Sequence, residues 1–118
     1  MGTDQHFLRR RRTPRRAIRR RVGLLIKGKY HINTAVEIGE GGMMILSDVP
    51  LKDGDRLVVT FNIPGVIHVV MGATVRYRIE PDSEFSQIRY GLHFDHIDFK
   101  TRRKIRNYVA SRGIHDVA

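Results

Sequence analysis

The sequence IHVVMGATVRYRI, residues 67–79, alternates between two kinds of side chain with a period of two. The first set is apolar: Ile67, Val69, Met71, Ala73, Val75, Tyr77 and Ile79. The second set is mostly polar or small: His68, Val70, Gly72, Thr74, Arg76 and Arg78. Successive side chains of a β-strand point to opposite faces, so this stretch predicts a strand with one buried and one mostly exposed face.

The same period occurs on both sides of this stretch. Residues 57–63 and 88–94 alternate in the same way, and shorter apolar stretches occupy residues 22–27, 32–38 and 43–46. The segments KGK, GEGG, KDGD, IPG and EPDS separate them and supply the residues that turns require. Six short antiparallel strands in one small domain favour a closed barrel, which leaves no exposed edge. We therefore expect an all-β fold, a six-stranded antiparallel β-barrel followed by a C-terminal helix.

The helix is predicted from a change of period near the end of the chain. Asp98 is a plausible N-cap, and Ile105, Tyr108 and Val109 recur at helical spacing. Gly113 can end the helix in a left-handed conformation. Basic side chains would crowd its exposed side, so we expect it to pack its apolar face on the mouth or flank of the barrel.

Length and composition bound the class of protein. The chain has 118 residues, room for one modest core, and no cysteine, which excludes disulfides, thiolate metal sites and cysteine nucleophiles. No apolar run approaches the roughly 20 residues that cross a bilayer, and no secretory segment is visible at the N-terminus. We expect a cytoplasmic protein without a membrane span.

The charge is concentrated in residues 1–22, which we call the arginine arm. This segment holds nine arginines against Asp4 alone, so it carries +8 of the formal net charge of +10. We expect a flexible arm at 1–22, the barrel and helix at 23–113, and a tail at 114–118. Such an arm predicts an anionic partner: nucleic acid, a phosphorylated small molecule or an acidic membrane surface. A solvated tail that aids solubility is the alternative.

Two motifs at a fixed distance narrow these possibilities. In RRTPR, Arg11 and Arg15 form an RxxxR element that includes Arg12. The turn EIGEGG begins at Glu37, 22 positions after Arg15. Its glycines permit positive φ and let a ligand approach bare backbone, and the Glu37 carboxylate offers an acceptor. Arginine suits phosphate and guanine because its planar guanidinium group can form two parallel hydrogen bonds to either one, and the face of this group can stack on a base.

This arrangement resembles a PilZ domain, the bacterial receptor module for the second messenger cyclic di-GMP. Glu37, Gly39 and Gly42 occupy the places of a (D/N)xSxxG motif, here degenerate as ExGxxG. The segments GDRLVVTFNIPG, GATVRY and RYGLHF and the arginine-rich helix resemble later parts of the family, so the likeness covers roughly residues 9–112. It implies a six-stranded barrel with a terminal helix.

The resemblance also implies a ligand site. The arm would wrap around cyclic di-GMP, with Arg11 and Arg15 bonding phosphates and guanine edges. Glu37 takes the place of the residue that accepts from guanine. The complete set of expected ligand-binding residues is Arg11, Arg12, Arg15, Glu37, Gly39, Gly42 and Arg76. Arg16 and Arg20 repeat the four-residue spacing and form a second possible register of the clasp, too close to the first strand to swing freely.

Three functions follow from these observations. The first is a cyclic di-GMP receptor that orders its arm and signals to a protein of a motility, secretion or polysaccharide machine. The second is a PilZ-like adaptor that has lost the ligand. The third is a small nucleic-acid-binding barrel, which we do not favour because the strand aromatics, Tyr77 among them, are expected in the core.

Catalysis and metal binding find little support in the sequence. No glycine-framed serine nucleophile or Walker-type phosphate loop is present, so we do not expect an enzyme. His93 and His96 would point to opposite faces of a strand, a poor arrangement for one metal ion. We expect no catalytic residues, no metal and no cofactor.

Overall fold

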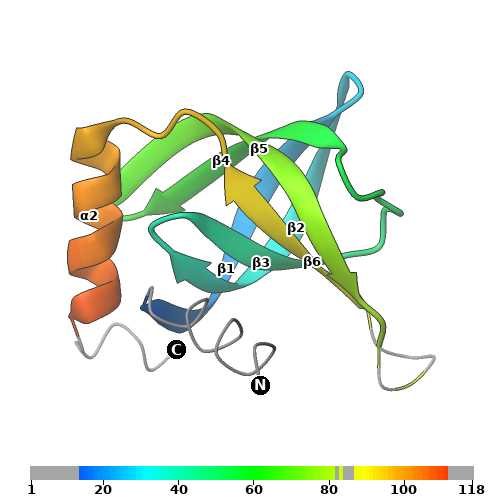
Figure 1. Cartoon of the computed structure of the whole chain (residues 1–118), viewed down its shortest axis with the longest axis horizontal. Coiled ribbons are helices and arrows are strands. Elements are labelled where there is room, and N and C mark those ends of the chain that lie inside the picture. Colours follow the sequence, from blue (N-terminus) through cyan, green and yellow to red (C-terminus); the bar gives the residue numbers. More distant parts are fainter. Residues whose placement is uncertain (1–13, 82, 84–86, 112–118) are drawn as a thin grey trace, which may run out of the picture.

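A computed structural model describes residues 14–81, 83 and 87–111 of the chain. These residues form a closed barrel of antiparallel strands with the order β1-β2-β3-β6-β5-β4, and a helix, α2, stands beside it (Figure 1). The elements are β1 (Arg15–Ile26), β2 (Lys29–Gly39), β3 (Gly42–Ser47), β4 (Arg56–Ile63), β5 (Ile67–Ile79), β6 (Ile88–Phe94) and α2 (Phe99–Ala110). The expected barrel with a C-terminal helix is confirmed.

The first strand begins earlier than the sequence predicted. β1 starts at Arg15 rather than near Val22, and it pairs with β2 from Arg15 opposite Gly39 to Ile26 opposite Lys29, with a shift of register between Ala17 and Arg20. Part of the arginine arm is therefore strand, because β2 is long enough to supply hydrogen-bond partners for it. Arg11 and Arg12 lie outside the described residues.

The barrel interior is filled by the alternating apolar sets. The predicted inward residues of β4, which are Leu57, Val59, Phe61 and Ile63, are all buried. Tyr90 of β6 is fully buried, and its hydroxyl accepts a hydrogen bond from the Leu51 N–H at 3.0 Å. Its polar group is thus satisfied inside an apolar core, as a buried tyrosine requires.

The alternation of β5 fails at its C-terminal end. The register between β5 and β6 shifts between Val75 and Tyr77, and Arg76, Tyr77, Arg78 and Ile79 are all exposed. The expectation that Tyr77 and Ile79 belong to the core is therefore wrong. A bulge inserts one residue and changes the phase of the side chains that follow, and the pairing of β5 with β4 extends only to Thr74.

Helix α2 begins as predicted, with Asp98 as N-cap. The Asp98 carboxylate accepts from the Thr101 N–H at 2.7 Å, and this bond lowers the pKa of Asp98. The helix ends at Ala110 with Ser111 as its C-cap in an extended conformation, whereas Gly113 lies outside the described residues. Ile105 and Tyr108 are buried against the barrel.

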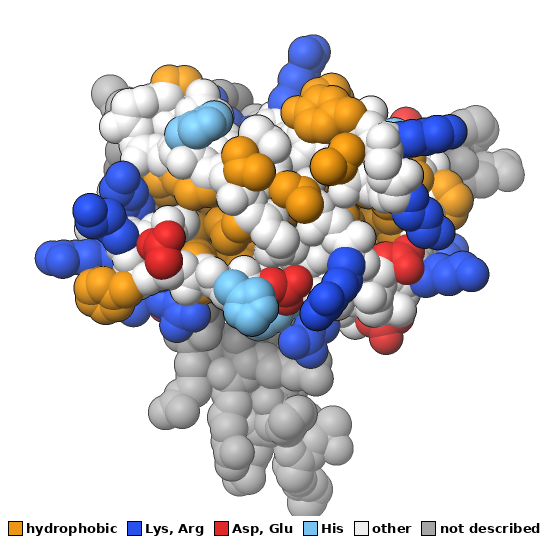
Figure 2. Space-filling model, turned by 90° about the horizontal axis from the view of Figure 1, so that it is seen from above, with side chains coloured by type: hydrophobic (Ala, Val, Ile, Leu, Met, Phe, Trp, Pro, Cys, Tyr) orange, Lys and Arg blue, Asp and Glu red, His pale blue; other side chains and the backbone are white. Residues whose placement is uncertain are grey.

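The surface of the described residues carries both hydrophobic and basic side chains (Figure 2). Seen from above, hydrophobic side chains gather near the middle of one face, and Lys and Arg side chains lie around its margin (Figure 2). Within residues 14–81, 83 and 87–111, no helix has the length and apolar character that crossing a membrane demands.

Arg16 fastens the start of β1 to the end of α2. Its side chain is buried, and its guanidinium donates to the Tyr108 carbonyl oxygen and, at 3.1 Å, to Ser111 Oγ. The guanidinium carbon also lies 3.8 Å from the centroid of the Tyr108 ring, a cation–π contact. The second register of the clasp is therefore not favoured, since Arg16 serves helix docking in this structure.

We predict that Arg16→Ala lowers the free energy of unfolding by about 2–4 kcal/mol, because charged hydrogen bonds contribute ~1.5–3 kcal/mol and the cation–π contact adds to them. Urea unfolding followed by circular dichroism measures this. The matched control is Arg19→Ala, which removes the same charge from an exposed position of β1. Equal stability of the two variants would contradict the docking role.

Gly42 allows β3 to lie close to β6. A Cβ atom at this position would lie 2.0 Å from the Leu92 carbonyl oxygen, which is backbone and cannot rotate away. No neighbouring atom lies within 4 Å of a Cβ at Gly41. Packing therefore requires glycine at position 42, whereas position 41 has room for a side chain.

We predict that Gly42→Ala costs roughly 1–3 kcal/mol of folding free energy, the usual range for overpacking. Gly41→Ala should leave stability almost unchanged, because its side chain enters open space. Thermal and urea unfolding of the two variants provide the comparison. A Gly42→Ala protein as stable as the Gly41→Ala protein would refute the close approach.

Candidate functional site

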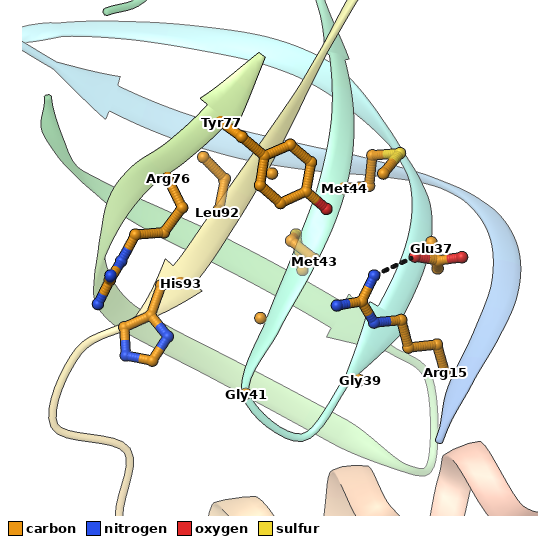
Figure 3. Close-up of a pocket in the computed structure, with 12 residues that line it drawn as sticks. Arg15, Glu37, Gly39, Gly41, Met43, Met44, Arg76, Tyr77, Leu92 and His93 are labelled. Carbon is orange, nitrogen blue, oxygen red and sulfur yellow. Dashed lines mark hydrogen bonds and ion pairs between the residues drawn. The ribbon is translucent and has the colours of Figure 1, made fainter. Parts of the chain in front are cut away.

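A pocket of about 220 Å³ lies on the outer surface of the barrel (Figure 3). Its lining comes from the start of β1, the end of β2, the β2–β3 turn, β3, the end of β5, and β6. Five of the seven expected site residues line it: Arg15, Glu37, Gly39, Gly42 and Arg76. The other two, Arg11 and Arg12, lie outside the described residues. The fold thus brings together residues that are far apart in the sequence.

Arg15 and Glu37 form an ion pair at one side of the pocket. The distance from Arg15 Nη1 to Glu37 Oε1 is 3.3 Å, and both side chains are partly exposed. The strand register explains the contact, since Arg15 pairs with Gly39 and Ala17 pairs with Glu37. An exposed pair of this kind contributes only about 0–1 kcal/mol, so a ligand can replace it at little cost.

The shape of β2 directs Glu37 toward the surface. Its pairing with β3 shifts between Ala35 and Glu37, and Ala35 and Ile38 are both buried whereas Glu37 is partly exposed. A local irregularity of this kind changes the direction of a side chain relative to its neighbours. The carboxylate consequently lies at the pocket, where Arg15 engages it.

Gly39 gives β1 room to begin beside the turn. A Cβ atom here would lie 3.1 Å from the Pro14 carbonyl oxygen and 3.3 Å from Arg15 Cγ. Among the described glycines, positive φ is found at Gly28, Gly54 and Gly65, and not at Gly39, Gly41 or Gly42. The sequence suggested left-handed backbone in this turn; instead, Gly39 and Gly42 allow close approach, and a side chain at Gly41 would enter open space.

The turn itself is held by helix α2. Glu40 accepts hydrogen bonds from Arg106 Nε at 3.1 Å and from Arg106 Nη2 at 3.2 Å. The hydrogen bond from Arg106 lowers the pKa of Glu40, and the same bond raises the pKa of Arg106. A paired-donor contact of this kind fixes orientation as well as distance. The sequence did not predict it, because the two residues are 66 positions apart.

Tyr77 and His93 are pocket residues that the sequence did not identify as ligand contacts. Tyr77 is 39% exposed, and its ring covers Gly91, where an added Cβ would lie 2.2 Å from Tyr77 Cζ. Arg76 and His93 lie together on the other side of the pocket (Figure 3). Gly91 was the available signal, since a glycine inside a strand often marks close approach of another group.

The chemistry of the pocket suits a planar anionic ligand. Arg15 and Arg76 supply guanidinium donors, Glu37 supplies one carboxylate, and Tyr77 supplies an aromatic ring. Guanidinium groups bond phosphate and stack on bases. Among the described residues, no three His, Asp or Glu side chains are placed to hold a metal ion.

Known proteins share this fold. The PilZ domain of YcgR from Escherichia coli with c-di-GMP superimposes with a TM-score of 0.70 and 16% identity, over 85% of this chain and 88% of that one. The Bacillus subtilis inhibitor of motility MotI/DgrA superimposes with a TM-score of 0.73 and 16% identity, over 85% of this chain and 49% of the MotI/DgrA chain. PlzA from Borreliella burgdorferi, in complex with c-di-GMP, superimposes with a TM-score of 0.62 and 15% identity, over 92% of this chain and 45% of the PlzA chain.

The chain therefore spans about half the length of MotI/DgrA and PlzA and most of the YcgR domain. A comparison with curated proteins found no match to the sequence. The sequence matches the PilZ domain family over residues 9–111, which is most of its length. Together with the closed barrel and its terminal helix, this match shows that the chain belongs to the PilZ domain family.

Proposed function

We propose that this chain is a receptor for cyclic di-GMP and that the pocket around Arg15 and Glu37 is its binding site. The observation that carries the proposal is their contact at 3.3 Å, which joins two motifs 22 residues apart. YcgR and PlzA, whose barrels have the same fold, were each solved with c-di-GMP. We extend that ligand to this chain because its pocket offers the chemistry such a compound requires.

Each pocket side chain has a distinct role in the proposal. Arg15 leaves Glu37 and bonds a phosphate or a guanine edge, and the Glu37 carboxylate then accepts from the N–H groups of guanine. Arg76 neutralises phosphate charge from the other side of the pocket. Tyr77 offers its ring to a base, and stacking of a base on an aromatic ring is worth about 1–3 kcal/mol.

The arginine arm completes the proposed site. Pro14, at the start of the described chain, lies beside the turn, because its carbonyl oxygen is 3.1 Å from the Cβ position of Gly39. Arg11 and Arg12 are four and three positions before Arg15, so extended chain places them within about 14 Å of it. We propose that ligand binding fixes this part of the arm over the pocket and changes the charge of that face. A partner protein would read this change.

An adaptor without ligand is the second candidate. Its support is the ExGxxG motif, in which Gly39 lacks the hydroxyl of the family serine. In addition, the carboxylate of Glu37 is already engaged by Arg15. In this candidate, the pair closes the pocket and the barrel binds its partner regardless of cyclic di-GMP.

Calorimetric titration with cyclic di-GMP separates these candidates. We predict saturable binding, and we expect Arg15→Ala to weaken it about 10- to 100-fold, because charged hydrogen bonds contribute ~1.5–3 kcal/mol. Arg19→Ala, which removes the same charge elsewhere on β1, should bind as the unaltered chain does. Absence of heat would favour the adaptor. Equal binding of unrelated oligonucleotides, with steep loss in salt, would indicate a nucleic-acid binder.

The missing hydroxyl at position 39 can be tested directly. We predict that Gly39→Ser binds cyclic di-GMP about 2- to 12-fold more tightly than Gly39→Ala, the equivalent of a hydrogen bond worth ~0.5–1.5 kcal/mol. The alanine variant is the matched control, since both side chains place the same Cβ against Pro14 and Arg15. Equal affinities of the two variants would show that this turn contacts its ligand differently.

A further inference from the structure

A strip of exposed apolar side chains crosses the barrel away from the pocket. We define the apolar strip as Leu25, Tyr30, Ile32, Val58 and Val70. Leu25, Tyr30, Ile32 and Val70 are each 43–60% exposed, and Val58 is partly exposed. Hydrophobic side chains gather in this way on the face seen from above (Figure 2). Contiguous apolar surface of this kind marks interaction sites more often than scattered single residues do.

The strand register shows that the strip is continuous. In one row, Tyr30 of β2 pairs with Leu25 of β1, which pairs with Val58 of β4. In the adjacent row, Ile32 pairs with Gly23, Gly23 with Thr60, and Thr60 with Val70 of β5. The Tyr30 ring fills the space above Gly23, where a Cβ would lie 1.9 Å from its hydroxyl oxygen. Four strands at ~4.8 Å spacing make the strip about 14 Å long.

Basic residues border the strip along both long sides. Arg21 stands two positions before Gly23 on β1, on the same face, and is exposed. On the opposite side, Lys27 and Arg56 line a groove of about 600 Å³ together with Leu25, Val58 and Val70.

Asp95 and His96 also line this groove. The Asp95 carboxylate accepts a hydrogen bond from Thr74 Oγ1 at 2.8 Å, so it is already engaged within the barrel. The groove thus offers two long basic side chains to an acidic partner.

The place of the strip in the sheet limits how a partner can bind here. Its rows run across the face of four hydrogen-bonded strands, β2, β1, β4 and β5, so a partner covers these side chains by packing on the sheet face and not by adding a strand at an edge. Ten residues of α-helix span about 15 Å, which matches the length of the strip. A helix lying across the strands would cover the apolar rows and present its flanks to the basic borders.

We propose that the apolar strip is the docking site for an acidic amphipathic helix of a partner protein. A second copy fits poorly, because the basic borders of the two chains, Arg21 on one side and Lys27 and Arg56 on the other, would face one another. Nucleic acid would leave the aliphatic rows uncovered. In the strand order, β1 and β4 lie opposite β6 and β3 of the ligand pocket. Partner and ligand can therefore occupy the barrel at the same time.

The test is a titration of the methyl-labelled full chain with synthetic helical peptides of about 18 residues. The probe peptide carries a Leu stripe at helical spacing with Glu on both flanks. One control replaces each Glu by Lys, and a second replaces each Leu by Gln. The second control matters because the arginine arm attracts any acidic peptide, whereas only the strip should require the Leu side chains.

We expect saturable binding of the probe, with shifts concentrated on the methyl groups of Leu25, Ile32, Val58 and Val70. The double variant Ile32→Thr with Val70→Thr keeps the charge and the strand propensity. It should bind at least about tenfold more weakly, because two exposed aliphatic contacts are lost. Arg56→Glu should weaken binding as well, and Arg19→Ala should not.

Three results would overturn the proposal. The first is equal binding of the probe and the Gln control, or of the unaltered chain and the double variant. The second is self-association in sedimentation velocity that the double variant abolishes, which would assign the strip to a second copy. The third is binding to phosphatidylglycerol vesicles through the same residues. None of these results depends on whether cyclic di-GMP binds.

Discussion

The pairing of Arg15 with Gly39 is the constraint on which the rest of the site depends. β1 starts directly opposite the end of β2, and its first two residues project to opposite sides, as consecutive residues of a strand do. Arg15 reaches Glu37 in the pocket, and Arg16 reaches Tyr108 and Ser111 at the end of α2. One short piece of backbone therefore positions the pocket and anchors the helix. A change in the position of Arg15 on ligand binding would act on backbone that also carries the helix contact.

Helix α2 contacts the same region from a second direction. Arg106 binds Glu40 in the β2–β3 turn through two hydrogen bonds, and Arg16 at the start of β1 binds Tyr108 and Ser111 at the end of α2. The turn and the start of β1, which pairs with the end of β2, thus each contact the helix. In the proposed receptor, this arrangement supplies a physical route from the pocket to an outer surface of the barrel. The apolar strip on the opposite side offers a separate place for a partner.

Much of the fold was predictable because the alternation of apolar residues reports burial directly. The inward residues of β4 and the N-cap Asp98 follow from local pattern alone. The start of β1 was not predictable in this way, since RRAIRRR has no apolar alternation. It becomes strand only because β2 offers it hydrogen-bond partners. Tyr77 was misassigned to the core, because a bulge depends on pairing between strands and leaves no trace in the period of one strand.

The sequence named five of the residues that line the pocket, but not their geometry. The resemblance to the PilZ family implied that Arg15 and Glu37 share a site, but the role of Gly42 in bringing β3 close to β6 required the structure. The most direct test of the central claim is a crystal structure of the full chain grown with cyclic di-GMP. The account predicts the ligand in the pocket, with the Arg15 guanidinium moved from Glu37 to the ligand and Tyr77 against a base. An empty pocket at saturating ligand, with Arg15 still bonded to Glu37, would contradict it.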